Sequence, residues 1–363
     1  MHFGLSEDQR MLRDSVARSL SDNCPLDHVR ECAEGEPVFS DKTMSALGEL
    51  GLPGMMVPEE HGGLGMSLLD AAVVAEQLGY AAAPVPFLAT NVLAALALTH
   101  AGSREQQADW LPRIARGEPR ISVAIAETVE ARDGAVVAAH GGGLSGTSLF
   151  ALDFRGADAF LVADGAGRLH LVPTDAAGLE TVALTTIDRT RSVGEVHLQG
   201  VAAEPLMADG GVAAARLRCA GRIILAADSL GAGEAMIEKA IDYAGQREQF
   251  GRVIGSFQAV KHMCAEMAAR HEPCRALVWY AAHAFDAAPD EARLAACHAK
   301  SHTGEVHRFV ARTSTEVHGG MGFTDLLGLH YWFKRIGFDR QVLGGPEAVR
   351  AEAATLQGWT RAA

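Results

Sequence analysis

The spacing of apolar residues changes twice along the chain, and this change constrains the fold more than any other feature. Up to about residue 121, apolar side chains recur at helical intervals. From 122 to 205 they alternate in short runs that are separated by Gly- and Asp-containing turns, and from 206 to 363 helical spacing returns. The sequence therefore predicts an α+β fold with an N-terminal helical domain at 1–121, a middle antiparallel β domain at 122–205 and a C-terminal helical domain at 206–363.

Local signals place several elements within these domains. Ser6 begins a capping box with Gln9, and a second helix is expected from Asp41 to Leu50, before Gly51. Glycines and a proline in residues 58–65 predict a turn. Further helices are expected at 68–78, 90–99, 211–244, 256–286 and 290–317. Strands are expected at 122–126, 135–138, 159–163, 168–172 and 195–198.

Composition excludes several classes of function. A net charge of −13 argues against binding to a nucleic-acid backbone, which requires clustered Lys and Arg. An apolar run of about 18 residues, which a membrane-spanning helix needs, does not occur, and the N-terminal residues lack the pattern of a signal peptide. The six cysteines form no C-x-x-C pair and show no zinc-ligand spacing. We therefore expect a cytoplasmic protein with reduced thiols and no metal site.

Two short motifs favour ordinary structure over chemistry. Residues 140–146 satisfy G-x-G-x-x-G by letter, but the segment that follows is strand-like, whereas a dinucleotide loop requires a helix there. A turn between two strands is the better interpretation. His298 and His302 stand four residues apart on an expected helix, but there is no H-E-x-x-H pattern and no third ligand. Surface or interface histidines explain this pair.

Residues 246–258 carry more information. Gly251 should end or break the preceding helix, which leaves backbone N–H groups near the start of the next helix. Arg247 could hold a pyrophosphate through its guanidinium group, and Gln258 could donate further hydrogen bonds. A solvated helix corner with an exposed arginine explains the same residues. The glycines of residues 319–322 add a second tight turn where the backbone could approach a flat ligand.

Nearly the whole chain resembles the acyl-CoA dehydrogenase family. Residues 52–65 are similar to the N-terminal signature of that family, 111–118 to the segment that leads into its β domain, and 188–191 to the end of that domain. Residues 246–258 and 316–323 are similar to its two C-terminal signatures. The resemblance implies an acyl-CoA dehydrogenase-like fold with a C-terminal four-helix bundle and with FAD at a subunit interface.

The resemblance also implies roles for individual residues. Arg247, Phe250 and Gln258 match the positions that contact the FAD of a neighbouring subunit. Gly319 and Gly320 match a second FAD contact, at which Glu316 replaces the usual Gln of the family. Because a carboxylate repels a pyrophosphate, this replacement puts the second contact in doubt.

The catalytic base of the family does not match. The reaction removes an α-proton from an acyl-CoA thioester while the flavin accepts the β-hydride, so a carboxylate must reach the α-carbon. Family members carry this carboxylate at one of two chain positions, which are occupied here by Gly221 and Gly344. Glu347, three residues beyond Gly344, is a candidate displaced base, although a solvent-facing side chain explains it better.

The segment that cradles the flavin ring in the family is also reduced here, to residues 126–133. The leading hypothesis is therefore a subunit that is inactive alone. It would form an α2β2 assembly with a homologous chain that carries the glutamate, would oxidise a bulky, steroid-type acyl-CoA and would pass electrons to an electron-transfer flavoprotein. One alternative is a self-sufficient homomer with Glu347 as base. Another is an acyl-CoA-binding or scaffold protein that has lost FAD.

Overall fold

The computed structural model describes residues 4–35, 39–129, 135–207 and 210–360. The chain divides into two compact units. One contains Met1–Val29, Ala72–Ala83 and Arg222–Ala363, and the other contains Arg30–Ala71 and Pro84–Gly221. Two helices, α4 (Leu68–Tyr80) and α7 (Val212–Gln246), contribute residues to both units.

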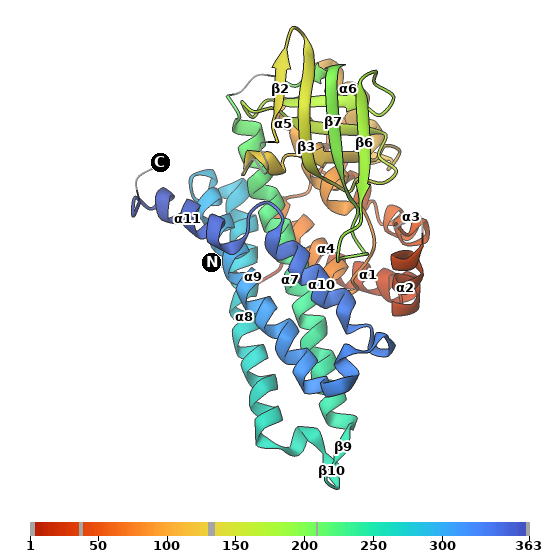
Figure 1. Cartoon of the computed structure of the whole chain (residues 1–363), viewed down its shortest axis with the longest axis vertical. Helices are drawn as coiled ribbons and strands as arrows, with labels where there is room; N and C mark the ends of the chain where they lie inside the picture. Colours follow the sequence, from red (N-terminus) through yellow and green to blue (C-terminus); the bar gives the residue numbers. More distant parts are fainter. Residues whose placement is uncertain (1–3, 36–38, 130–134, 208–209, 361–363) are drawn as a thin grey trace. The chain divides into compact units, whose positions relative to one another are not determined.

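An eight-stranded sheet dominates the second unit in the described part of the chain (Figure 1). Its order is β6-β7-β3-β1-β4-β5-β8, and β2 pairs with β3. The helices of this unit include α3 (Asp41–Glu49), the π-helix η3 (Phe87–Ala94), α5 (Ala95–Ala101) and α6 (Arg104–Ala115). The strands are β1 (Ile121–Ala124), β2 (Val137–His140), β3 (Gly143–Leu152), β4 (Ala159–Ala163), β5 (Leu169–Pro173), β6 (Leu179–Leu184), β7 (Val193–Ala202) and β8 (Glu204–Pro205).

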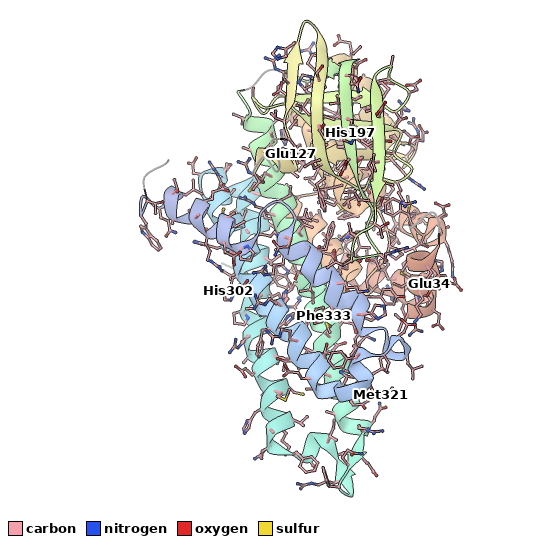
Figure 2. All side chains as sticks on the ribbon, viewed as in Figure 1. Glu34, Glu127, His197, His302, Met321 and Phe333 are labelled. Atoms are coloured by element: carbon pink, nitrogen blue, oxygen red, sulfur yellow. The ribbon has the colours of Figure 1, made fainter. Side chains whose placement is uncertain are left out.

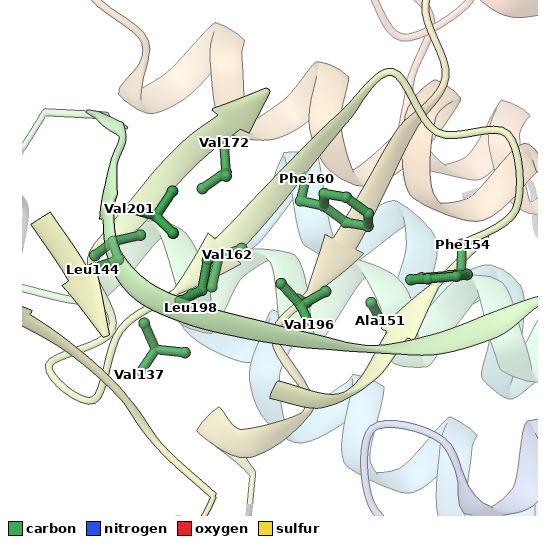
Figure 3. Close-up of a cluster of buried hydrophobic side chains, with 11 residues drawn as sticks. Val137, Leu144, Ala151, Phe154, Phe160, Val162, Val172, Val196, Leu198 and Val201 are labelled. Carbon is green, nitrogen blue, oxygen red and sulfur yellow. The ribbon is translucent and has the colours of Figure 1, made fainter. Parts of the chain in front are cut away.

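The core of this sheet consists of alternate side chains from neighbouring strands (Figure 3). It includes Phe154 and Phe160, whose ring centroids are 5.7 Å apart. Val162, Val172 and Val196 of the same cluster are fully buried. This burial of β-branched and aromatic side chains accounts for the strands that the alternating pattern predicted.

Long helices form the first unit. Those that follow the sheet in sequence are α7, α8 (Gln258–Ala287), α9 (Pro289–His318), α10 (Leu329–Gln341) and α11 (Pro346–Leu356), and α1 (Glu7–Asn23) precedes it. The helix α9 packs against α8, α10 and α11, and seventeen of its residues are buried. The buried guanidinium of Arg335 on α10 donates to Asp228 on α7 at 3.0 Å and to the carbonyl of Ala83 at 2.9 Å.

The structure agrees with most of the predicted elements. Ser6 and Gln9 form the capping box of α1. Residues 140–146 lie in the β2–β3 hairpin, and its turn is formed by Gly141 and Gly142, both with positive φ. The observed α7, α8 and α9 begin and end within a few residues of the predicted helices. The division into three domains stays a prediction, and the two compact units divide the chain differently.

Some details differ from the prediction. The sheet is not wholly antiparallel, because β1 and β4 pair in parallel. The helices α2 (Leu26–Glu34) and α6 are additional, and the expected helix at 90–99 is a π-helix in its first half. Within the described ranges, no helix is long and apolar enough to cross a membrane.

Candidate FAD-contact segments and base positions

The segment after α7 is a short hairpin. The strands β9 (Glu248–Gln249) and β10 (Arg252–Val253) pair in antiparallel fashion, and the carbonyl of Arg247 accepts a hydrogen bond from Ile254 at 2.7 Å. Phe250 and Gly251 form the turn with φ of 53° and 72°. Two successive residues at positive φ are typical of tight hairpin turns, and glycine adopts this conformation without strain.

This hairpin turns its side chains outward. Phe250 is 92% exposed, and Arg247 and Gln258 are exposed as well. The ring of Phe257 packs against the hairpin. Its centroid lies 6.2 Å from that of Phe250, in an edge-on arrangement, and 4.0 Å from Cζ of Arg252. The segment therefore exposes a cation, an aromatic ring and an amide. This exposure is compatible with both interpretations of the sequence, a contact with the FAD of a neighbour and a solvated helix corner.

The second glycine-rich segment lies where α9 ends. Gly319 has a φ of 57°, and its N–H donates to the carbonyl of Glu316. A Cβ atom placed on either Gly319 or Gly320 would meet no atom within 4 Å, so the backbone of both residues is open to a ligand. Figure 2 places Met321, the next residue, at this end of the helical unit. The geometry therefore fits a flat group that approaches the backbone.

Both segments occur at one end of the helical unit. Tyr243 on α7 stacks against His318, the last residue of α9, with ring centroids 4.6 Å apart. The hairpin follows Tyr243 by a few residues, and Gly319 follows His318 directly. Glu316 is exposed on the last turn of α9, where its charge would disfavour a phosphate.

Each candidate base position is next in sequence to one end of a hydrogen bond made by a buried arginine, Arg222. Gly344 follows α10 with a φ of 106°, and Gly221 lies within α7. Arg222, the residue after Gly221, is 2% exposed, and its Nε donates to the carbonyl of Leu343, the residue before Gly344, at 2.9 Å. Neither glycine can accept a proton through a side chain.

A carboxylate that the sequence reasoning missed accompanies this arginine. Nη1 of Arg222 donates to Oε2 of Glu352 on α11 at 2.8 Å, and Arg293 donates to Oε1 at 2.6 Å. Burial raises the pKa of Glu352, but the two guanidinium groups outweigh burial and lower it. A carboxylate that is held ionised by two cations is a poor proton acceptor. Glu352 thus acts as the partner of Arg222.

The side chain of Glu347 faces solvent, as expected if it is an ordinary surface residue and not a displaced base. Its side chain is 72% exposed in the first turn of α11. Its Oε1 lies 3.5 Å from Nη2 of Arg340 and 3.6 Å from Nη2 of Arg350. Glu347 therefore takes part in exposed ion pairs at the surface.

The reduced cradle in the β domain is occupied by contacts within the chain. Glu127, labelled in Figure 2, accepts hydrogen bonds from Ser148 Oγ and from the N–H of Leu149, both at 2.7 Å. The carbonyl of Thr128 accepts from Arg218 at 3.0 Å. The remainder of the predicted segment, residues 130–133, lies outside the described residues. The described part of the cradle is therefore engaged with β3 and α7.

Other candidate groups do not form a second site. His298 and His302 are exposed on α9, and no group of three potential metal ligands occurs in the described ranges. A cavity of about 920 Å³ lies between α1, α4, α7, α8 and α10, next to the buried ion pair of Glu76 and Arg275. None of the predicted site residues lines this cavity.

Comparison with known proteins identifies the family. The N-terminal domain of acyl-CoA dehydrogenases matches residues 6–118, and their C-terminal domain matches residues 210–355. The chain belongs to the acyl-CoA dehydrogenase family. Members of this family are FAD-dependent. The predicted family and fold class are thereby confirmed.

Proteins similar to this chain include a steroid acyl-CoA dehydrogenase and one chain of a complex. Acyl-CoA dehydrogenase IpdE2 of Mycobacterium tuberculosis is 33% identical over 347 residues, which are 94% of this chain and 95% of the relative. The ChsE4-ChsE5 complex from Mycobacterium tuberculosis contains a chain that matches with a TM-score of 0.91 and 29% identity over 100% of both chains. A variant of the steroid acyl-CoA dehydrogenase Tcur3481-Tcur3483 matches with a TM-score of 0.89 and 30% identity, over 97% of this chain and 98% of the other. This acyl-CoA dehydrogenase is thus similar to a chain of the ChsE4-ChsE5 complex and to a steroid acyl-CoA dehydrogenase.

Proposed function

We propose that this chain is the base-less subunit of a heteromeric acyl-CoA dehydrogenase. A homologous partner would carry the glutamate and an intact flavin cradle, and this chain would contact the partner's FAD. The proposal rests on two features of the chain taken together. The exposed hairpin of Phe250 is retained, while both base positions, Gly221 and Gly344, lack a carboxylate.

The residues present fit part of an FAD molecule. Arg247 would neutralise the pyrophosphate, Phe250 would pack against a ring of the cofactor, and Gln258 would hydrogen-bond to it. Gly319 and Gly320 would let the backbone approach, because a side chain at either position would occupy the open space. FAD, when bound, accepts the hydride that leaves the β-carbon of the acyl group. The part of this chain in the reaction is to hold the cofactor for a neighbour.

The relatives support the heteromer and the substrate class. The similar chain in the ChsE4-ChsE5 complex belongs to an assembly of two different chains, and Tcur3481-Tcur3483 is described as a steroid acyl-CoA dehydrogenase. We extend this to an acyl-CoA with a bulky, steroid-type side chain, to an α2β2 assembly and to an electron-transfer flavoprotein as acceptor.

Co-expression tests the proposal. The chain would be purified alone and together with homologous acyl-CoA dehydrogenase chains from the same genome, and oxidation of steroid side-chain acyl-CoA thioesters would be followed with an artificial electron acceptor. We expect turnover only from a complex of two different chains. Turnover by the chain alone would contradict the proposal.

A further inference from the structure

The loop that carries the second base position has an unusual backbone. Leu343 and Gly344 adopt successive positive φ values of 57° and 106°. Only three other non-glycine residues in the described ranges have a positive φ, and Leu343 is 3% exposed. An L-amino acid is strained in this region of φ because its Cβ crowds the backbone. A buried leucine held there indicates that the surrounding structure imposes the conformation.

Two buried basic side chains donate to backbone carbonyls, one in this loop and one in the helix before it. The Nε of Arg222 donates to the carbonyl of Leu343 at 2.9 Å, and Nζ of Lys300 donates to the carbonyl of Asp339 in the last turn of α10. Both cationic side chains are 2% exposed. The last carbonyls of a helix have no partner within that helix, so cations at this end bind them favourably.

The arginine is itself fixed from other sides. Its Nη1 donates to Glu352 at 2.8 Å and contacts the sulfur of Cys297 at 3.5 Å. Cys297 packs with Val349 and Ala353 in an apolar cluster between α9 and α11. Because its guanidinium is planar and its Nη1 is held by Glu352 and Cys297, the direction of its Nε is restricted. The carbonyl of Leu343 lies in that direction.

We propose that Arg222 is a positioning residue that locks the turn at Leu343 and Gly344 in its left-handed conformation. In this turn, position 344 requires glycine. The assignment of position 344 as a base position rests on the proposed function. The lack of a base at position 344 then depends on the backbone conformation of the turn as well as on the absent side chain. A glutamate placed at 344 would strain the turn or displace it from Arg222, so a single substitution would not recreate the base.

The first test compares alanine substitutions in the full chain. Gly344→Ala should lower the midpoint of urea denaturation, because alanine disfavours a φ of 106°. Gly337→Ala is the matched control. It lies on α10 seven residues earlier, outside the positive-φ positions, and its added Cβ would meet no atom within 4 Å. The control should keep or raise the midpoint. An unchanged midpoint for Gly344→Ala would overturn the proposal.

The second test separates backbone conformation from crowding. A chain with D-alanine at 344, made by ligating a synthetic C-terminal segment, should keep the midpoint of the unmodified sequence, since a D-residue favours positive φ. Equal losses from D- and L-alanine would show that crowding, and not the left-handed turn, demands glycine.

The third test concerns the role of Arg222. Arg222→Lys keeps the charge but cannot donate in two fixed directions, so the turn is released. In that background Gly344→Ala should lower the denaturation midpoint less than it does in the original chain. If Gly344→Ala lowers the midpoint equally in both backgrounds, Arg222 does not hold the turn. If the lysine variant does not fold, Glu352→Gln serves as the background, because it loosens the guanidinium and keeps it in place. All these measurements use the chain without flavin, so they can fail while the proposed FAD contact in a heteromer holds.

Discussion

At the residue scale, Glu347 is the position at which the two enzyme hypotheses differ. If the chain is base-less, Glu347→Gln should leave turnover of the heteromer within about twofold, because the substitution removes only exposed ion pairs with Arg340 and Arg350. Such pairs contribute at most about 1 kcal/mol to stability. Steady-state turnover checks this prediction. A loss of about a hundredfold or more, as the removal of a general base causes, would support the self-sufficient enzyme instead.

Arg247 gives a second prediction at this scale. Arg247→Ala should weaken FAD binding by the heteromer about tenfold or more, because a charge-assisted hydrogen bond to phosphate contributes roughly 1.5–3 kcal/mol. Titration of the flavin-free complex with FAD measures the change. Arg308→Ala removes the same charge from an exposed position on α9, ten residues before its end, and should have little effect. Equal affinities for both variants would exclude the contact.

Single residues also show where sequence reasoning stops. Arg247, Phe250 and Gln258 stand within twelve residues of one another, so a local motif could reveal them. Arg222 and Leu343 are 121 residues apart, and Arg222 and Glu352 are 130 apart. No spacing rule joins such residues, and only the packing of α7 against the end of α10 and against α11 does so. The only signal in the sequence was the arginine that follows Gly221 in a largely apolar helix.

At the scale of elements, close packing of α4 and α7 depends on glycine. A Cβ at Gly231 would lie 1.7 Å from the carbonyl oxygen of Glu76, whereas Gly245 on the same helix has open space. Gly231→Ala should therefore lower the free energy of unfolding by about 3 kcal/mol or more, since the two helices must separate. Gly245→Ala should raise it by up to about 1 kcal/mol. Urea denaturation of the two variants decides the prediction, and similar values for both would contradict it.

Elements with strong local signals were predictable from sequence. The capping box of Ser6 and the apolar spacing of α7, α8 and α9 have local causes, and these helices occur as expected. The π-helix at Phe87–Ala94 has no such signal, because it depends on contacts with the sheet. Thr90 exchanges hydrogen bonds with the backbone of Ile121, and Asp153 accepts from the N–H of Ala89. The parallel pairing of β1 and β4 is likewise set by tertiary contacts.

At the scale of the whole molecule, a buried pair of histidines makes stability depend on pH. Ser229, His307 and His271 form a chain of hydrogen bonds across α7, α9 and α8, with distances of 2.9 and 3.2 Å. Burial lowers the pKa of His307 well below its usual value, and the nearby His271 lowers it further. Burial and then Arg275 lower the pKa of His271. The folded state therefore resists protonation of both rings.

The direction of the pH dependence follows from linkage. Below the unfolded pKa of about 6.5, the unfolded chain binds protons that the folded chain excludes, so stability is complete above that pH and falls as the pH drops. The slope for these groups is up to about 1.4 kcal/mol per pH unit for each excluded proton. Urea denaturation between pH 7.5 and roughly 5 should show this loss, and His271→Gln should reduce the slope. A slope that the substitution leaves unchanged would assign the pH dependence to other groups.

The whole assembly is the scale at which the central claim applies, namely that this chain contacts a partner's flavin and lacks the means to use its own. The most direct measurement is the ratio of FAD to chain after purification, taken from flavin absorbance and protein concentration. We predict almost no FAD in the chain purified alone, and bound FAD once the homologous chain is co-expressed, with fewer FAD molecules than chains. A full complement of FAD in the chain alone would contradict the account.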